Sequence, residues 1–434
     1  MATPPRRPLC VAPSTALLID PDKTVRPCCR YFPPIGAHVP GSFGIGRLDE
    51  HTTVADVRDG AAWREVADQL AAHEMPAGCR DCLQQERDSG LAGSREYDDE
   101  DWQQGITFLE INTSNICTLQ CRHCDGHFSH RWARVQGMPT HKADPELLLE
   151  SLRGIDLSHV KRVAFKGGEP LVNPDLVSVL KHLDAIGRLQ HVTVRITTNG
   201  TVAPEEPLAW LRKARSCEFG ISVDGVGDLQ TYIRHGPSSL DKIERFLQVY
   251  GAIPRVRFGV IVSVMAYNVC TLPAIADWWR ALAGYPMGNR WIQRWRRWRG
   301  RAEFRPISFQ HFVTSPKHLA VTCLQDHTRA QLVRRFQALD PLRYAQVIRM
   351  LQAPYAGDRI HDQWVLETLR KDRLLGRDFR AVLPELAAEF ELLDPAALFA
   401  ELERSRREGA TTQADHEQDV QALSRLPQRQ AGPS

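Results

Sequence analysis

The chain has 434 residues, of which 43% are apolar and 25% are charged, and its formal net charge at pH 7 is +3. This length exceeds one simple hydrophobic core, so we expect more than one domain. The small net charge gives no reason to expect nucleic acid or an anionic membrane as a partner. With no apolar run of about 18 residues and no apolar N-terminal stretch, the sequence predicts a soluble, cytoplasmic protein.

The first 100 residues combine short strand patterns with many prolines and glycines. Strands are predicted at Ala16–Ile19 and Thr24–Arg26, and a helix at Ala62–Glu74. Five of the eleven cysteines fall in this region, at Cys10, Cys28, Cys29, Cys79 and Cys82. Because disulfides are rare in the cytoplasm, we expect reduced thiols that are available as metal ligands. The sequence therefore predicts a small cysteine-rich α+β domain over residues 1–100.

From residue 106 onward, β-branched apolar runs alternate with helical patterns, which is typical of a parallel sheet built from βα units. Six strands are predicted, at Ile106–Ile111, Arg162–Phe165, Val192–Thr197, Glu218–Val223, Val256–Val264 and Pro306–Val313. Helices lie between them, at Pro145–Gly154, Asp175–Gly187, Glu205–Arg215, Leu240–Gly251 and Thr271–Gly284. The predicted fold class is α/β, a partial (β/α)6 TIM-like barrel over residues 101–325 with its functional groups after the strands.

Beyond residue 326 the pattern becomes helical, with predicted helices at Ala330–Leu339, Tyr344–Gln352 and Asp362–Leu374. From Glu403 the chain is rich in Arg, Glu and Gln, which is typical of a frayed tail. We therefore predict a helical C-terminal extension with a polar tail over residues 326–434.

Three cysteines, Cys117, Cys121 and Cys124, follow the first barrel strand with the spacing C-x3-C-x2-C. In a loop, all three side chains can point toward one site, and thiolate ligands favour zinc or iron–sulfur. A closed zinc site takes four ligands, and only His123 or His127 lies close by as a fourth. Three ligands predict an open site, and a [4Fe–4S] cluster held by three thiolates exposes one iron to a small molecule. A zinc knuckle is the alternative.

Four further motifs follow in strand order: FKGGEP at 165–170, TTNGT at 197–201, ISVDG at 221–225 and YIR at 232–234. Together with CTLQCRHC, they resemble the motifs of the radical S-adenosylmethionine (SAM) superfamily. The resemblance implies a partial barrel of the radical SAM type. It also implies that Cys117, Cys121 and Cys124 hold a [4Fe–4S] cluster whose open iron chelates the amino and carboxylate groups of SAM.

The same resemblance implies roles for the residues that bind SAM. The segment expected to hold the methionine ammonium is Gly167, Gly168, Glu169 and Pro170. Ser222 is implied to contact the ribose and Arg234 to pair with the SAM carboxylate, a bidentate task that suits a guanidinium. Asn199 and Asp224 complete the predicted SAM-binding set. The alternatives are a solvated turn for Glu169 and a surface salt bridge for Arg234. His123 stands where the superfamily often has an aromatic residue.

A second cysteine set precedes the barrel. Cys10 and Cys28 flank a predicted β-hairpin, and Cys79 and Cys82 form a C-x2-C pair. Four thiolates form a closed site, whose spacing does not distinguish zinc from iron–sulfur. The surrounding segments resemble the twitch/SPASM auxiliary domains of radical SAM enzymes, which implies a second, auxiliary [4Fe–4S] cluster; such domains usually follow the barrel. We favour Cys28 over Cys29, because the ligand in the family follows Pro. A structural zinc ribbon is the alternative.

The resemblance implies a radical SAM enzyme that cleaves SAM reductively and forms a 5′-deoxyadenosyl radical. This radical would abstract hydrogen from a peptide or small-metabolite substrate, assisted by the auxiliary cluster. The expected partners are that substrate and an electron donor such as flavodoxin or ferredoxin, with neither membrane nor nucleic acid expected. The alternatives are a zinc-binding scaffold or peptide-binding module, and a radical SAM RNA modifier or methyltransferase.

Three tryptophans lie at helical spacing between arginines, at Trp291, Trp295 and Trp298. Packing against the barrel is the default interpretation of this stripe, and a surface for an acidic substrate, leader peptide or RNA is the alternative. The remaining cysteines are predicted to be buried core thiols, at Cys217, Cys270 and Cys323.

Overall fold

A single sheet organises this computed structural model, which describes residues 7–80, 82, 101–284, 287 and 290–390. Its nine strands have the order β3-β2-β1-β4-β5-β6-β7-β8-β9. Pairing is parallel from β1 through β4 to β9 and antiparallel among β1, β2 and β3. The strands are β1 (Ala16–Ile19), β2 (Thr24–Arg26), β3 (Gly46–Arg47), β4 (Phe108–Ile111), β5 (Arg162–Phe165), β6 (Thr193–Thr198), β7 (Ser216–Ser222), β8 (Val256–Ile261) and β9 (Glu303–Phe304).

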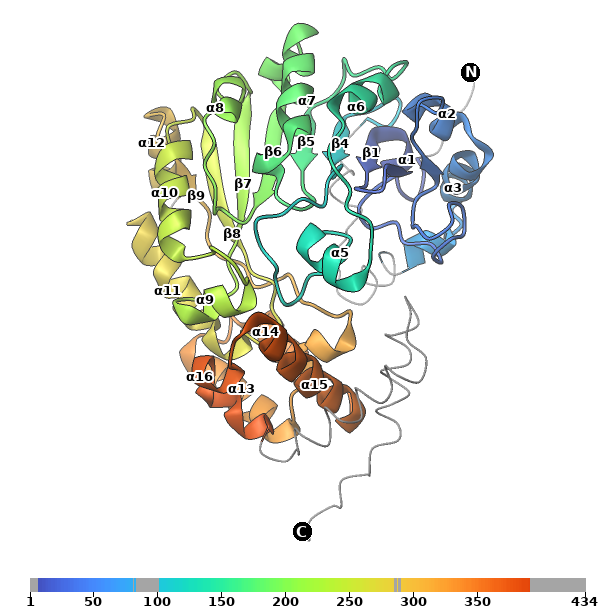
Figure 1. Ribbon diagram of the computed structural model, residues 1–434. Coiled ribbons are helices and arrows are strands. Elements are labelled where there is room, and N and C mark those ends of the chain that lie inside the picture. The colour runs from blue at the N-terminus through green and yellow to red at the C-terminus, as the bar shows by residue number, and fades with distance from the viewer. Residues whose placement is uncertain (1–6, 81, 83–100, 285–286, 288–289, 391–434) are drawn as a thin grey trace.

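Helices connect the parallel strands and cover one face of the sheet (Figure 1). The polar residues Asp144 and Asn173 cap the first turns of α6 and α7, and Pro occupies the first turn of each of these helices. The helices between β4 and β9 are α5 (His130–Gln136), α6 (Pro145–Ser151), α7 (Pro174–Ala185), α8 (Glu206–Leu211), α9 (Asp228–Ile233), α10 (Leu240–Tyr250), α11 (Leu272–Ala283) and α12 (Arg290–Trp298).

The two faces of the central strands differ in character because side chains alternate along a strand. In β6, buried and partly exposed residues alternate throughout. The buried residues pack against the helices: Phe219 of β7 contacts the rings of Phe246 and Tyr250 of α10, with centroid separations of 5.4 and 5.3 Å. The partly exposed positions, such as Arg195 and Glu218, therefore lie on the opposite face, which we call the open face.

Strands β1, β2 and β3, between residues 16 and 47, extend the barrel sheet. Both predicted strands are found at their predicted positions, and β1 pairs in parallel with β4, with Leu17 opposite Leu109. The helices of this region are α1 (Ala12–Thr15), α2 (Val54–Asp59) and α3 (Ala61–Ala71), and Trp63 of α3 belongs to the same apolar core as the barrel. Residue 100 is therefore not a boundary of the sheet. The pairing joins segments about ninety residues apart, which no local pattern indicates.

The sixth predicted strand, Pro306–Val313, is wrong. The structure instead has β9 at Glu303–Phe304, and Arg305 makes the last ladder bond, from its N–H to the carbonyl of Phe258 at 2.8 Å. Pro306 has no N–H to continue the ladder. Beyond it, an isolated bridge joins Val264 to Phe312. The other five predicted barrel strands are present, with small shifts at their ends.

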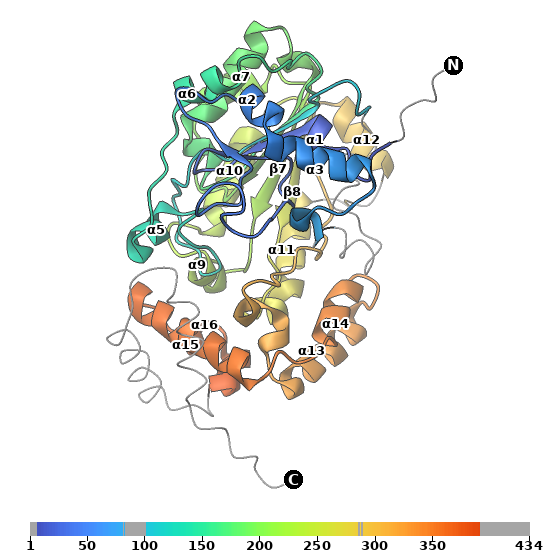
Figure 2. The ribbon, with the colours of Figure 1, turned by 90° about the vertical axis from the view of Figure 1, so that its right-hand side faces the viewer.

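The C-terminal helices lie beyond the sheet, on the side of α5 and α9, which follow the ends of β4 and β7 (Figures 1 and 2). Trp364 of α15 is completely buried and contacts the rings of Tyr267, Phe379 and Phe390. This apolar contact joins the extension to the barrel. Its elements are α13 (Asp326–Leu339), α14 (Ala345–Leu351), α15 (Asp358–Leu375), α16 (Phe379–Val382) and the 3-10 helix η8 (Pro384–Phe390). The predicted polar tail lies outside the described residues.

The tryptophan stripe of α12 does not pack as predicted. Trp291 is 79% exposed and Trp295 is 48% exposed. Arg299 and Arg301 instead lie over the Trp295 ring, each 5.7 Å from its centroid. Arginines that directly follow the helix supply an alternative contact for this exposed indole. The side chain of Trp298 lies outside the described set.

The isolated cysteines are buried as predicted, because Cys217, Cys270 and Cys323 are each at most 1% exposed. Among the described helices, none has the length and apolar character needed to cross a membrane.

Candidate active site

The cysteine loop, residues 112–129 between β4 and α5, carries Cys117, Cys121 and Cys124. Helix α5 holds this loop by hydrogen bonds: the indole N–H of Trp132 donates to the carbonyl of Cys121 at 2.7 Å. The N–H of Cys117 donates to Nδ1 of His130 at 3.1 Å. These bonds fix the backbone beside Cys117 and Cys121. The three thiols themselves are free cysteines.

The three thiols lie close together, with Cys121 buried and Cys117 and Cys124 partly buried. Burial, together with the nearby thiol of Cys121, raises the pKa of Cys117 to about 12. Burial likewise raises the pKa of Cys121 and of Cys124, and Cys124 is also affected by both other thiols. Deprotonation at neutral pH therefore requires a positively charged group among them, as iron ligation provides. This donor set fits an iron–sulfur cluster.

A single metal ion would need a different arrangement of ligands from a cluster. Within the described ranges, no three His, Cys, Asp or Glu side chains are arranged to hold one ion. A [4Fe–4S] cube, in contrast, takes one thiolate at each of three separate irons.

The glycines of the GGEP segment bring a second loop against the cysteine loop. The N–H of Gly168 donates to Ser114 O at 3.0 Å, and that of Glu169 donates to Ile116 O at 2.9 Å. A Cβ on Gly168 would lie 2.2 Å from Ile116 O, and Gly167 has φ +103°. Only glycine permits this approach and this backbone conformation. The sequence interpretation connected these glycines with SAM; the contact they allow here is between two loops.

Glu169 joins the loops that follow β5 and β6. Its side chain is 1% exposed and accepts hydrogen bonds from Thr198 Oγ1 at 2.7 Å, Asn199 N at 2.8 Å and Leu171 N at 3.1 Å. Burial raises the pKa of this carboxyl, and the bonds from Asn199 and Thr198 oppose that rise. The solvated-turn alternative is therefore wrong. Pro170 begins the 3-10 helix η3 (Pro170–Val172) directly after it.

Asn199 connects Glu169 to the first cysteine, Cys117. Its Nδ2 donates to Thr118 Oγ1 at 3.0 Å and lies 3.9 Å from Cys117 Sγ. Its Oδ1 accepts from the N–H and the hydroxyl of Thr201 at 3.0 and 2.7 Å. The end of β6 thereby holds the Cys117 side of the loop.

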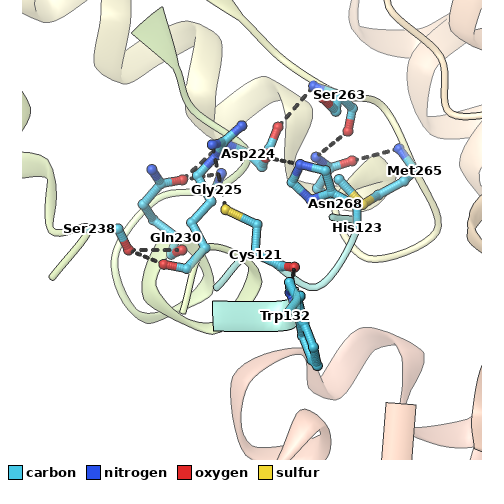
Figure 3. A network of polar contacts seen from close by, with 11 residues as sticks. Cys121, His123, Trp132, Asp224, Gly225, Gln230, Ser238, Ser263, Met265 and Asn268 are labelled. Carbon is cyan, nitrogen blue, oxygen red and sulfur yellow. Dashed lines mark hydrogen bonds and ion pairs between the residues drawn. The ribbon is translucent and has the colours of Figure 1, made fainter. Parts of the chain in front are cut away.

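The end of β7 holds the Cys121 side (Figure 3). Oδ1 of the fully buried Asp224 accepts from Ser263 N at 2.8 Å, and Oδ2 lies 2.8 Å from Arg234 Nε. The Arg234 guanidinium also donates to Cys121 Sγ at 3.8 Å. Arg234 is 7% exposed, so the surface salt-bridge alternative is wrong. Ser222 is 9% exposed and closes β7 two residues before Asp224.

Two buried polar atoms beside Asp224 have no hydrogen-bond partner within the described part of the chain, His123 Nδ1 and Gln230 Nε2. His123 Nε2 lies 3.7 Å from Asp224 Oδ2, and Gln230 Oε1 accepts from Asp224 N at 2.9 Å. Burial lowers the pKa of His123 to about 4, so the ring is neutral at pH 7. Such unpaired atoms are costly unless a polar ligand contacts them. This fits the binding of a polar molecule such as SAM.

Sequence reasoning missed Arg122, which lies between two cysteines and is completely buried. Its guanidinium donates to Asp372 Oδ1 at 2.5 Å and to Tyr232 O at 3.0 Å, and lies 3.7 Å from the centre of the Tyr232 ring. The carbonyl of Arg122 accepts from Lys371 Nζ at 2.6 Å. Helix α15 thus fixes the middle of the cysteine loop. The two partners are 250 residues apart, which gives no signal in the sequence.

The second cysteine set also comes together. Burial raises the pKa of Cys28 strongly, and the thiols of Cys29, Cys10 and Cys79 raise it further. Burial raises the pKa of Cys79 to about 12, with contributions from Cys10 and Cys82. All four predicted ligands are therefore neighbours, and Cys29 belongs to the same group.

The fold explains how the second set assembles. The 3-10 helix η1 (Ala77–Cys79) lies against the segment after Cys28, because Phe32 N donates to Gly78 O at 2.9 Å. Cys10 and Cys28 pack against a small apolar cluster that includes Phe108 of β4 and Ala164 of β5. Register places both strand residues on the same side of the sheet as Arg195, which is the open face, so the second set lies on that face.

Residues 111–267 match the sequence model of the radical SAM superfamily. This range contains Cys117, Cys121 and Cys124 together with the GGEP segment, Asn199, Asp224 and Arg234. It forms a radical SAM superfamily domain, a domain of enzymes that use SAM and a [4Fe–4S] cluster. The predicted α/β fold class is confirmed, and the match supports the predicted enzyme class. The match does not extend to the second cysteine set.

Individual relatives match only part of the chain. A GTP 3′,8-cyclase of Petrotoga mobilis is 29% identical over 153 residues, which are 33% of this chain and 44% of that protein. Molybdenum cofactor biosynthesis protein 1 of Bos taurus is 32% identical over 27% of this chain and 18% of its own length. An Fe-coproporphyrin III synthase of Methanosarcina barkeri is 27% identical over 38% and 39%. The chain thus spans less than half the length of these three relatives.

A solved structure described as native anSMEcpe with bound AdoMet and Cp18Cys peptide also resembles this chain. It is 15% identical, covers 63% of this chain and 66% of that chain, and has a TM-score of 0.34. At this level of similarity it supports no conclusion about substrate.

Replacing Gly168 tests the contact between the two loops. We expect Gly168→Ala to displace the cysteine loop, because the new Cβ would overlap the carbonyl of Ile116. Iron and acid-labile sulfide per chain, measured after anaerobic reconstitution, should fall by the content of one cluster. The matched control is Gly187→Ala, which strains a positive φ but has no neighbour within 4 Å. Equal cluster content in both variants would contradict the role of Gly168.

Replacing Asp372 tests the attachment of α15. Asp372→Asn leaves the buried Arg122 cation without its charge partner, and breaking such a pair costs about 3–5 kcal/mol. We expect the variant to lose iron to a chelator several times faster than the parent protein. Glu367→Gln is the control, since the carboxylate of Glu367 pairs with Arg370 on the same helix. Loss of iron at the parental rate in both variants would contradict a role of the Arg122–Asp372 pair in holding the cysteine loop.

Proposed function

We propose that the chain is a radical SAM enzyme that cleaves SAM reductively and abstracts hydrogen from a peptide or small-metabolite substrate. The observation that carries the proposal is the convergence of one buried and two part-buried thiols with the ends of β5, β6 and β7, inside the range that matches the superfamily. The zinc-scaffold alternative does not account for this match.

The cluster and SAM would supply the electron transfer and the 5′-deoxyadenosyl radical, with the electron coming from a donor such as reduced flavodoxin or ferredoxin. Cys117, Cys121 and Cys124 would hold the cluster. Glu169 and Asn199 would position the loop around Cys117 through the bonds described above. Arg234, already held by Asp224, would offer its remaining N–H groups to the SAM carboxylate.

The polar atoms beside Asp224 support the placement of SAM. The unpaired Nδ1 of His123 and Nε2 of Gln230 are suited to hydrogen-bond a bound polar ligand. Ser222 lies at the same strand end and is proposed to contact the ribose. The buried surroundings exclude water from the reacting atoms, which protects a radical from side reactions.

We further propose that Cys10, Cys28, Cys79 and Cys82 hold an auxiliary [4Fe–4S] cluster. Four neighbouring thiols, of which Cys28 and Cys79 have pKa values raised by burial, support a closed cluster site. Its place on the open face supports a role in exchanging an electron with the substrate. The neighbouring Cys29 is the competing ligand.

Formation of 5′-deoxyadenosine tests the main proposal. The reconstituted protein should produce it from SAM in the presence of dithionite, and Cys121→Ala should reduce the yield by at least 100-fold, because one ligand of the cluster is lost. Cys217→Ala, which removes a buried thiol of β7 outside both sets, should retain the parental yield. A colourless, sulfide-free parent protein that forms no 5′-deoxyadenosine would refute the proposal.

A separate prediction concerns the auxiliary set. Cys79→Ala should lower iron and sulfide by one cluster while the protein still cleaves SAM without substrate. Comparing Cys28→Ala with Cys29→Ala should identify the fourth ligand, because only the ligand's loss removes the cluster. If Cys79→Ala leaves iron and sulfide unchanged, the set does not hold a cluster.

A further inference from the structure

Helix α5, on the outside of the molecule, has an exposed face beside the cysteine loop (Figures 1 and 2). Trp132, on its inner side, is buried. Arg134 and Val135 lie three and four residues after Arg131, so both neighbour it on one face of the helix, and all three residues are exposed. Val135 is 45% exposed, and Phe128, just before the helix, is 44% exposed. We call Phe128, Arg131, Arg134 and Val135 the α5 surface.

The end of helix α15 continues this surface. Lys371 Nζ lies 5.3 Å from the centre of the Trp132 ring, which places α15 beside α5. Leu374, three residues further along α15, is 48% exposed. Arg377, just after the helix, is also exposed and donates to Thr231 Oγ1 at 3.3 Å. Exposed apolar side chains and arginines from two helices far apart in the sequence therefore lie in one region.

The chain around α5 is positively charged. Residues 126–143 contain both arginines of the α5 surface but no Asp or Glu. The carboxylates on either side of this segment have partners: Asp125 Oδ1 lies 3.4 Å from His127 Nδ1, and Asp144 caps α6. The arginines of the α5 surface therefore give this part of the molecule a positive potential.

Two histidines show that this positive charge reaches the cysteine loop. His130 accepts from the backbone of the first cysteine, and its pKa is lowered by burial and by both arginines of the α5 surface. The carbonyl of His235 accepts from a backbone N–H of the cysteine loop at 2.8 Å. Burial and the charge of Arg377 lower the pKa of His235, and Arg122 and Arg131 contribute in the same direction. Arginines from both helices thus act on one imidazole beside the loop.

The inner side of α5 contacts the backbone of the cysteine loop directly. His130 and Trp132 bond to the backbone of Cys117 and Cys121, and Ser129 Oγ donates to a carbonyl between these two cysteines at 3.0 Å. One layer of side chains therefore separates the α5 surface from the loop that carries the three thiols. A molecule bound to this surface lies close to the proposed cluster.

We propose that the α5 surface, extended by Leu374 and Arg377, is the docking site of the electron donor, a small acidic redox protein of the flavodoxin or ferredoxin class. Opposite charges accelerate and orient such encounters, and arginine and aromatic residues are enriched in protein interfaces. Complexes for electron transfer bury little surface, so one short helix and the end of another are sufficient.

This inference rests on the proposed function, because the electron is used to cleave SAM. A flavodoxin hydroquinone would give one electron to the cluster and become the semiquinone, and no bond forms or breaks in this step. Docking itself is a binding event that can be measured without SAM.

The apolar part of the surface favours a protein partner over a nucleic acid. Affinity for nucleic acid comes largely from cationic and polar groups that contact phosphates. Val135 and Leu374 offer neither a charge nor a ring that could stack on a base. A partner protein, in contrast, would remove these side chains from water, which favours binding.

Calorimetric titration of the reconstituted protein with a flavodoxin, a ferredoxin and a short RNA tests the docking site. We expect at least one of the two redox proteins to bind at low salt, and its affinity to fall as salt is added, because salt screens opposite charges. Combining Arg131→Glu with Arg134→Glu should weaken this binding about tenfold, since two attractive charges become repulsive. Any binding of the RNA should be the same in this double variant and the parent protein.

The matched control combines Lys242→Glu with Arg245→Glu. Both residues are exposed on α10, with the same spacing and the same change in total charge, and α10 lies away from α5 (Figures 1 and 2). This control should bind the donor as the parent protein does. The inference is overturned if neither redox protein binds, if both double variants weaken binding equally, or if the α5 double variant loses RNA binding while donor binding is unchanged. Circular dichroism and iron content establish that the variants are folded.

Two reductants separate docking from the radical chemistry. With dithionite, which needs no docking site, the α5 double variant should form 5′-deoxyadenosine at the parental rate. With a limiting amount of the reduced redox protein that binds, the rate should fall about tenfold. A protein that binds the donor through the α5 surface but cleaves no SAM with dithionite contradicts the radical chemistry alone. A protein that cleaves SAM with dithionite, but whose donor binding does not depend on the α5 surface, contradicts the docking inference alone.

Discussion

The close approach of the loop after β5 to the cysteine loop is the constraint on which the rest of the site depends. Gly168 lies against the carbonyl of Ile116, one residue before Cys117, and no residue with a Cβ fits there. Once the loops are in contact, Glu169 is buried and must find donors, which it does at Thr198 and Asn199. The close contact at one glycine thus leads to a chain of hydrogen bonds that connects the loop after β5 to the end of β6 and then to the first thiol.

The other side of the cysteine loop depends on charge. Asp224 and Arg234 form a buried pair beside Cys121, and Arg122 forms another with Asp372 of α15. Buried ion pairs add little net stability, but removing one partner leaves an uncompensated charge, so such pairs fix a particular arrangement of the chain. The first pair lies within the barrel and contacts the loop through Arg234 and Cys121, and the second connects α15 to the loop itself. The C-terminal extension is therefore part of the support of the site.

Much of the site was predictable because its signals are local. The spacing of Cys117, Cys121 and Cys124, and the GGEP segment at the end of a strand, identify the cluster loop and its neighbour by residue type alone. Five of six barrel strands follow from β-branched runs. The sixth was placed too late, at Pro306–Val313, since an apolar extended segment and a hydrogen-bonded strand have the same pattern. The outward-facing tryptophans of α12 were misjudged because helical periodicity does not tell which face is covered.

The sequence by itself determined the fold class, the first ligand set and the superfamily resemblance, because each depends on residues close together in the chain. Only the tertiary structure decided that β1 extends the barrel sheet, that Asp372 pairs with Arg122, and that three arginines from β6, β8 and the segment after β9 meet at Glu218. These contacts join residues far apart in the chain. Which strands become neighbours, and which faces they turn to one another, is set by packing of the whole molecule.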